Sequence, residues 1–93
     1  MEDRDNFYQN LKAKLDDTTT FPSDYLYKFI VSVAGNKVAL VQEIFQDKEA
    51  LITIKKSKTG KYNSISIVIK LATSDEVISY YKQAEKIEGI ISL

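Results

Sequence analysis

Apolar and polar residues alternate along two segments of the chain, and this alternation predicts two β-strands. In the segment 25–33 the odd-numbered positions are aromatic or valine, among them Tyr27 and Phe29. In the segment 64–71 one face consists of Ile65, Ile67, Ile69 and Leu71. Successive side chains of a strand point to opposite sides of a sheet, so each segment has one face suited to a core.

Apolar residues recur at helical spacing in two further segments. The first helix is expected at 37–48, where the apolar positions are Val38, Val41, Ile44 and Phe45, with Asn36 as its N-cap. The second is expected to begin at Thr73, whose hydroxyl and the Glu76 carboxylate form a capping box. Its buried stripe is expected to be Val77, Ile78, Tyr81, Ala84 and Ile87.

Two shorter strands complete the pattern, at 51–56 and 90–93, and the segment 57–60 predicts a hairpin turn with Gly60 at φ > 0. The order β-α-β-β-α-β predicts an α+β, ferredoxin-like fold: one four-stranded antiparallel sheet with both helices on one face. The strands at 25–33 and 64–71 are the most apolar, so we expect them at the centre of the sheet.

An amphipathic helix is expected before this unit, so the chain divides into a helix with its linker at 1–20 and a ferredoxin-like domain at 21–93. Phe7, Leu11 and Leu15 fall at i, i+4 and i+8 and would form its apolar stripe. About three helical turns are marginally stable alone in water. The helix therefore either packs on its own domain or docks on another molecule as a recognition or dimerisation helix.

The composition excludes several kinds of chemistry. The 93 residues contain 13 basic and 13 acidic side chains, with no cysteine and no histidine. A thiolate nucleophile is therefore missing, and so is histidine, the commonest acid–base group and metal ligand. We expect no enzymatic activity, no metal site and no cofactor. The chain opens on acidic residues and has no apolar stretch near the roughly 20 residues that span a membrane, which predicts a cytoplasmic protein.

Four lysines lie close together around the predicted hairpin, at positions 55, 56, 58 and 61. They either bind a phosphate or carboxylate, or form a solvated hairpin that protects an edge strand from pairing with other chains. The open face of the sheet, opposite the helices, is expected to be flat and semi-apolar. The candidate residues for binding a ligand or a partner are Lys28, Lys58, Gly60, Lys61, Tyr62, Ser64 and Ser66.

Phe21-Pro22, Tyr27-Lys28 and above all the run from Ser57 to Ile67, with its Gly-x-Tyr-x-Ser-Ile-Ser pattern, resemble the YbeD-like family of small bacterial proteins. The resemblance covers 21–93. It implies a ferredoxin-like fold similar to ACT regulatory domains, and with it a regulatory or ligand-sensing role.

Three functions follow as hypotheses. The first is a non-catalytic ACT-like module that senses a small anionic metabolite or modulates a partner enzyme, as a homodimer. The second is a protein-interaction adaptor that binds no small ligand. RNA binding is the third and is disfavoured, since Tyr62 alone is available as an aromatic platform on the open face; we expect no nucleic acid and no membrane among the partners.

Overall fold

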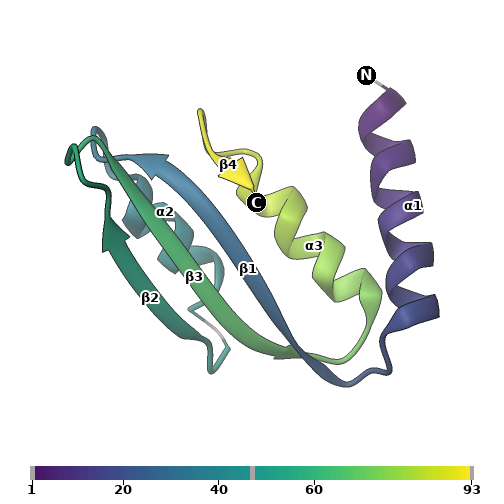
Figure 1. Cartoon of the computed structure of the whole chain (residues 1–93). Helices are drawn as coiled ribbons and strands as arrows, with labels where there is room; N and C mark the ends of the chain where they lie inside the picture. Colours follow the sequence, from purple (N-terminus) through teal and green to yellow (C-terminus); the bar gives the residue numbers. More distant parts are fainter. Residues whose placement is uncertain (1, 47, 93) are drawn as a thin grey trace.

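The computed structural model describes residues 2–46 and 48–92, with side chains from residue 6 onward. Its elements are α1 (Glu2–Thr18), β1 (Ser23–Ser32), α2 (Lys37–Ile44), β2 (Leu51–Lys56), β3 (Tyr62–Leu71), α3 (Ser74–Ala84) and β4 (Ile91–Ser92). The strands form one antiparallel sheet in the order β2-β3-β1-β4 (Figure 1). This is the ferredoxin-like βαββαβ arrangement that the sequence predicts, with β1 and β3 at the centre.

The core lies between the inner faces of β1 and β3 and the two helices of the ferredoxin-like unit. Tyr27 pairs with Ile67 and Phe29 with Ile65 across these strands, and all four side chains are fully buried. Val41 from α2, Phe45 directly after that helix, and Val77 and Ala84 from α3 complete the core. The helices therefore cover one face of the sheet and leave the other open, as expected.

The Tyr27 side chain connects the sheet to both helices. Its ring lies 5.3 Å from the Phe45 ring and 4.9 Å from the Tyr81 ring, measured between centroids. Its hydroxyl donates a hydrogen bond to the carbonyl oxygen of Val77 at 2.8 Å. Burial raises the pKa of Tyr27 well above its ordinary value, because a phenolate would lose its hydration there.

The helix ends follow the sequence prediction only in part. At the start of α3 the Glu76 amide donates to the Thr73 hydroxyl at 3.2 Å, as expected, but the Glu76 carboxylate accepts from the Ala72 amide instead of that of Thr73. Asn36 lies at the N-cap of α2 without a side-chain capping bond. The regular part of α2 ends at Ile44, before the expected position 48. The Phe45 amide donates to the Gln42 carbonyl three residues earlier, and not to the residue four earlier as in an α-helix. Asp47, within the expected helix, lies outside the described residues.

The two edge strands are more exposed than the central pair. In β2, Leu51 and Ile54 are 69% and 42% exposed. The described part of β4 has only Ile91 and Ser92, which pair with Ile30 and Phe29. The expected strand 90–93 is thus shorter at its start, and Leu93 lies outside the described residues.

The N-terminal helix α1 packs on α3 of its own chain, which is the first of the two alternatives. Figure 1 shows it beside α3, on the opposite side of that helix from β2. The expected stripe is wrong at one position. Tyr8 and Leu15 are 5% and 8% exposed, whereas Phe7 is 52% exposed. Tyr8, Leu11 and Leu15 fall at i, i+3 and i+7, so the helix turns this face toward α3.

Candidate ligand-binding site

A hollow of about 390 Å³ lies on the open face of the sheet, beside the β2–β3 hairpin. Its centre is Ser64 on β3, which pairs across the sheet with Ile30 on β1 and with Lys55 on β2. Directly opposed residues of an antiparallel pair point to the same face. The small serine between two long side chains therefore leaves space above it, and the Tyr62 side chain bounds that space two residues earlier on β3.

Three lysines border one side of this hollow. Lys55, Lys56 and Lys58 line it from the end of β2 and from the turn, together with Ser57. Among the described residues, none that line the hollow carries a carboxylate. The local charge is therefore positive although the chain as a whole has no net charge, and an anion is favoured there.

The hairpin turn uses its own amides internally. The Gly60 amide donates to the Ser57 carbonyl at 3.0 Å, and the Tyr62 amide to the Ser57 hydroxyl at 3.1 Å. The Lys61 amide points to the Thr59 hydroxyl at 3.4 Å. Gly60 has no side chain, so as a candidate binding residue it could offer an anion only its backbone amide. In the structure that amide is engaged in the turn, whose left-handed φ of 76° at Gly60 is as predicted.

The structure brings together three of the seven predicted site residues: Lys58, Tyr62 and Ser64. Lys28 and Ser66 face the same side of the sheet, but they pair with each other one row further from the turn and do not line the hollow. Lys61 is exposed on the turn outside it.

Four lining residues are absent from the predicted site: Ile30, Lys55, Lys56 and Ser57. In the sequence, Ile30 is one of the even-numbered residues of the segment 25–33, which belong to the open face. The two lysines belong to the charged cluster and Ser57 to the predicted turn. The strand register identifies two of them, because it places Ile30 and Lys55 on either side of Ser64. It does not identify Lys56, which pairs with Asn63.

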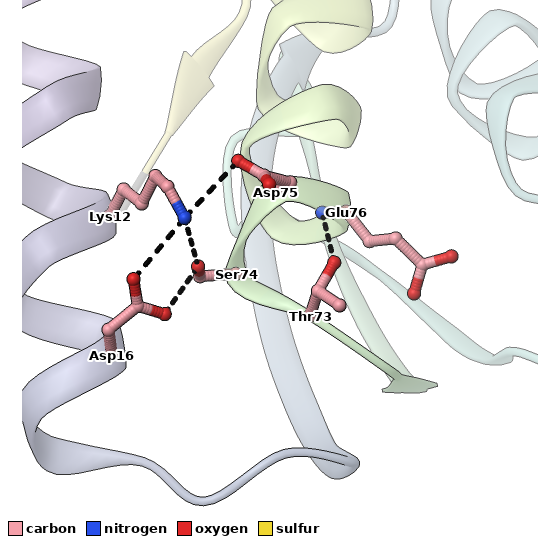
Figure 2. A network of polar contacts seen from close by, with 6 residues as sticks. All are labelled: Lys12, Asp16, Thr73, Ser74, Asp75 and Glu76. Carbon is pink, nitrogen blue, oxygen red and sulfur yellow. Dashed lines mark hydrogen bonds and ion pairs between the residues drawn. The ribbon is translucent and has the colours of Figure 1, made fainter.

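A second polar cluster joins α1 to the start of α3 (Figure 2). The Ser74 hydroxyl donates to Asp16 Oδ1 at 2.6 Å, and Lys12 Nζ lies 3.2 Å from Asp16 Oδ2, 3.2 Å from Ser74 Oγ and 3.4 Å from Asp75 Oδ1. These bonds, that from Ser74 first, lower the pKa of Asp16 below its ordinary value. Because Asp16 already supplies the anion at this helix N-terminus, we assign the cluster to the attachment of α1.

A cavity of about 510 Å³ separates α1 from the loop before β4. Phe7 and Leu11 line one side and Ile87 and Ile90 the other, with Tyr81 of α3 between them.

Across the residues that the structure describes, no three potential metal-ligating side chains gather at one place. No helix in the same part of the chain is long and apolar enough to span a membrane.

The fold and the open-face hollow define a small ferredoxin-like α+β domain. Residues 16–93 match the model of the family described as a protein of unknown function, DUF493. The chain belongs to this family, which confirms the YbeD-like resemblance.

The curated relatives are uncharacterised proteins of similar length. A UPF0250 protein of Haemophilus influenzae (strain PittEE) is 35% identical over 89 residues, covering 88% of this chain and 92% of its own. The UPF0250 protein of Shewanella halifaxensis is 32% identical over 84 residues, covering 86% of this chain and 94% of its own. The UPF0250 protein YbeD of Escherichia coli O1:K1 is 30% identical over 81 residues, covering 84% and 93%.

A solved structure supports the fold independently. The solution structure of protein HP0495 from H. pylori superposes with a TM-score of 0.64 at 16% sequence identity, covering 82% of this chain and 86% of that one. At this level of identity the similarity establishes the architecture, which is the ferredoxin-like fold expected from the sequence.

Proposed function

We propose that this protein is a non-catalytic regulatory module of the cytoplasm that senses a small anionic metabolite and passes the signal to a partner enzyme. One observation carries the proposal: the hollow over Ser64, lined by Lys55, Lys56 and Lys58, with no carboxylate among its described lining residues. Its volume is within the range of small-molecule sites, about 300–1,000 Å³. The similarity to ACT domains, which the family resemblance implies, agrees with a sensing role.

A thermal-shift screen of the full chain tests the proposal, using carboxylates, amino acids, nucleotides and sugar phosphates. A ligand at 100 times its Kd stabilises a protein by about 2.7 kcal/mol, which for a domain of this size raises Tm by roughly 10 °C. We expect at least one anionic compound to raise Tm in the unmodified protein and to lose this effect in Lys58→Glu.

Lys61→Glu is the matched control, because it makes the same change of charge on the same turn outside the hollow. Equal loss of the response in both variants would show only a general electrostatic effect. A screen in which no anion raises Tm would contradict the sensing role.

A second candidate, the interaction adaptor, is favoured by a different part of the open face. Leu26 on β1 pairs with Val68 on β3, which pairs with Leu51 on β2, so that three aliphatic side chains form one row across the sheet. They are 57%, 37% and 69% exposed. Exposed apolar patches of this kind occur at protein–protein contacts.

The adaptor hypothesis predicts a partner that co-purifies with the unmodified protein and with Lys58→Glu, but not with the double variant Leu26→Ser/Leu51→Ser. Urea unfolding of the double variant checks that the fold is intact. A partner retained by the double variant would exclude this row as the contact.

A further inference from the structure

The hollow over Ser64 has two chemically different sides. Because the strand order is β2-β3-β1, Ile30 on β1 lies on the opposite side of Ser64 from Lys55 on β2. The Tyr62 side chain adds a second nonpolar wall at the start of β3, whereas Lys58 adds charge on the β2 side. Lys56 pairs with Asn63, so its side chain points to the other face of the sheet.

We propose that the ligand is an organic oxyanion with a ring-sized or short-chain apolar body, a refinement that rests on the function proposed above. The oxyanion, a carboxylate or a phosphate, lies toward Lys55 and Lys58, and the apolar body lies on Ile30 and Tyr62. A lysine ammonium is a compact point charge without the planar fork of arginine, so it accepts either oxyanion.

The apolar side is what distinguishes this ligand from a simple inorganic anion. The three lysines are exposed, and solvent and salt weaken the attraction of exposed charges. Burial of apolar surface is not weakened in this way. Burial of about 60 Å² of apolar surface, which a single aromatic ring can supply, raises affinity about tenfold.

The size of the hollow limits the ligand. About 390 Å³ is close to the lower end of small-molecule sites, so a nucleoside polyphosphate or a long acyl chain would extend beyond it. The turn amides at 60–62 are engaged within the hairpin, so the oxyanion is held by side chains and not by a backbone cradle.

An NMR titration of the full chain tests the ligand class with defined probes: phenylacetate, phenyl phosphate, acetate, inorganic phosphate and phenethylamine. The reporters are the Ile30 methyl groups and the Ser64 amide. We expect phenylacetate or phenyl phosphate to shift both reporters saturably, about tenfold more tightly than acetate or inorganic phosphate. Phenethylamine, a cation of similar shape, is expected to leave them unchanged. The comparison of phenylacetate with phenyl phosphate decides which oxyanion is preferred.

Two substitutions on one strand form a matched pair for the same titration. Ser64→Leu fills the hollow without altering any lysine, and Ser66→Leu adds the same side chain to the same face one row away, outside the hollow. We expect Ser64→Leu to weaken binding of the aromatic anion at least tenfold, and Ser66→Leu to leave it within twofold. Equal weakening by both would place the site elsewhere on the open face and overturn the assignment.

Failure of the ligand class and failure of the proposed function give different results. If acetate and inorganic phosphate bind at these reporters as tightly as the aromatic anions, the apolar body is excluded while the hollow remains an anion site. If none of the anions moves the reporters and no anion raises Tm in the thermal-shift screen, both proposals are overturned.

Discussion

The Tyr27 hydroxyl donates a hydrogen bond to the Val77 carbonyl oxygen at 2.8 Å, so the central strand β1 is joined to the first turn of α3 through a buried side chain. Removing the hydroxyl leaves the ring contacts in place and takes away only this bond. Tyr27→Phe is therefore expected to lower the free energy of unfolding by about 1 kcal/mol, measured by urea denaturation. Tyr25→Phe, which alters a bond between two half-buried hydroxyls, is expected to cost less, and the reverse order would contradict the assigned role of Tyr27.

High pH is expected to destabilise the protein through its buried tyrosines. Burial raises the pKa of Tyr27 and of Tyr81 above the ordinary value near 10. Above that value the unfolded chain releases these protons while the folded chain keeps them, so the free energy of unfolding falls as pH rises beyond about 10. The pKa of Lys12, raised chiefly by its hydrogen bond to Asp16, acts in the same direction. Urea unfolding between pH 8 and 11.5 measures the slope, which should be shallower in Tyr27→Phe; an unchanged slope would show that Tyr27 is not its source.

Acid is expected to loosen the attachment of α1. The pKa of Asp16 is lowered by hydrogen bonds from Ser74 first and Lys12 second. Its contribution is thus complete above the ordinary value near 4 and is lost as pH falls through the lower folded-state value. Asp16→Asn should flatten the fall in stability between pH 5 and 2. Ser74→Ala, which removes the main cause, should raise the Asp16 pKa in an NMR titration; no change there would assign the shift to Lys12 alone.

The two sides of α1 are expected to respond differently to truncation. Leu15→Ala removes a side chain that is 8% exposed and leaves space between α1 and α3, so we expect a loss of about 2–3 kcal/mol in the free energy of unfolding. Phe7→Ala removes a larger side chain that is 52% exposed and should cost clearly less. Chemical denaturation of both variants measures the difference, and equal losses would mean that α1 packs through the Phe7 face in solution.

The hairpin turn depends on the left-handed conformation of Gly60, whose φ is 76°. A Cβ atom at this position would meet no neighbouring atom within 4 Å, so any cost comes from the backbone and not from a clash. Gly60→Ala is expected to lower the free energy of unfolding by about 1–2 kcal/mol. Gly60→Asn should cost less because asparagine tolerates this conformation better. A loss that is equal for both would show that the backbone angle is not the cause.

The faces of the central strands were predictable from the sequence because alternation depends only on the period of a strand. Ile65 and Ile67 are fully buried as expected, and so are Tyr27 and Phe29. The stripe of α1 was less determined, since Phe7 and Tyr8 are adjacent and aromatic and only the partner helix decides which of them is buried. The sequence left open whether the stripe packs on its own domain or on another molecule, and it could not choose Tyr8 over Phe7, because both depend on the docking geometry of α1 and α3.

The candidate site was predictable only as a region. The lysine cluster and Tyr62 indicate the hairpin, but the hollow exists because Ser64 lies directly between Ile30 and Lys55. That relationship joins residues from three strands, and no local pattern contains it. The availability of the Gly60 amide was also beyond the sequence, because it depends on how the turn closes.

The hydrogen bonds that hold the hairpin turn do not involve the lysine side chains beside the hollow. The amides of Gly60 and Tyr62 are held by Ser57, so the turn keeps its shape whichever side chains stand at Lys55 or Lys58. Substitutions at these positions should therefore change the charge beside the hollow, and with it the proposed ligand preference, without rebuilding the backbone. The charge of the hollow and the stability of the ferredoxin-like unit should in this sense be separable by single substitutions.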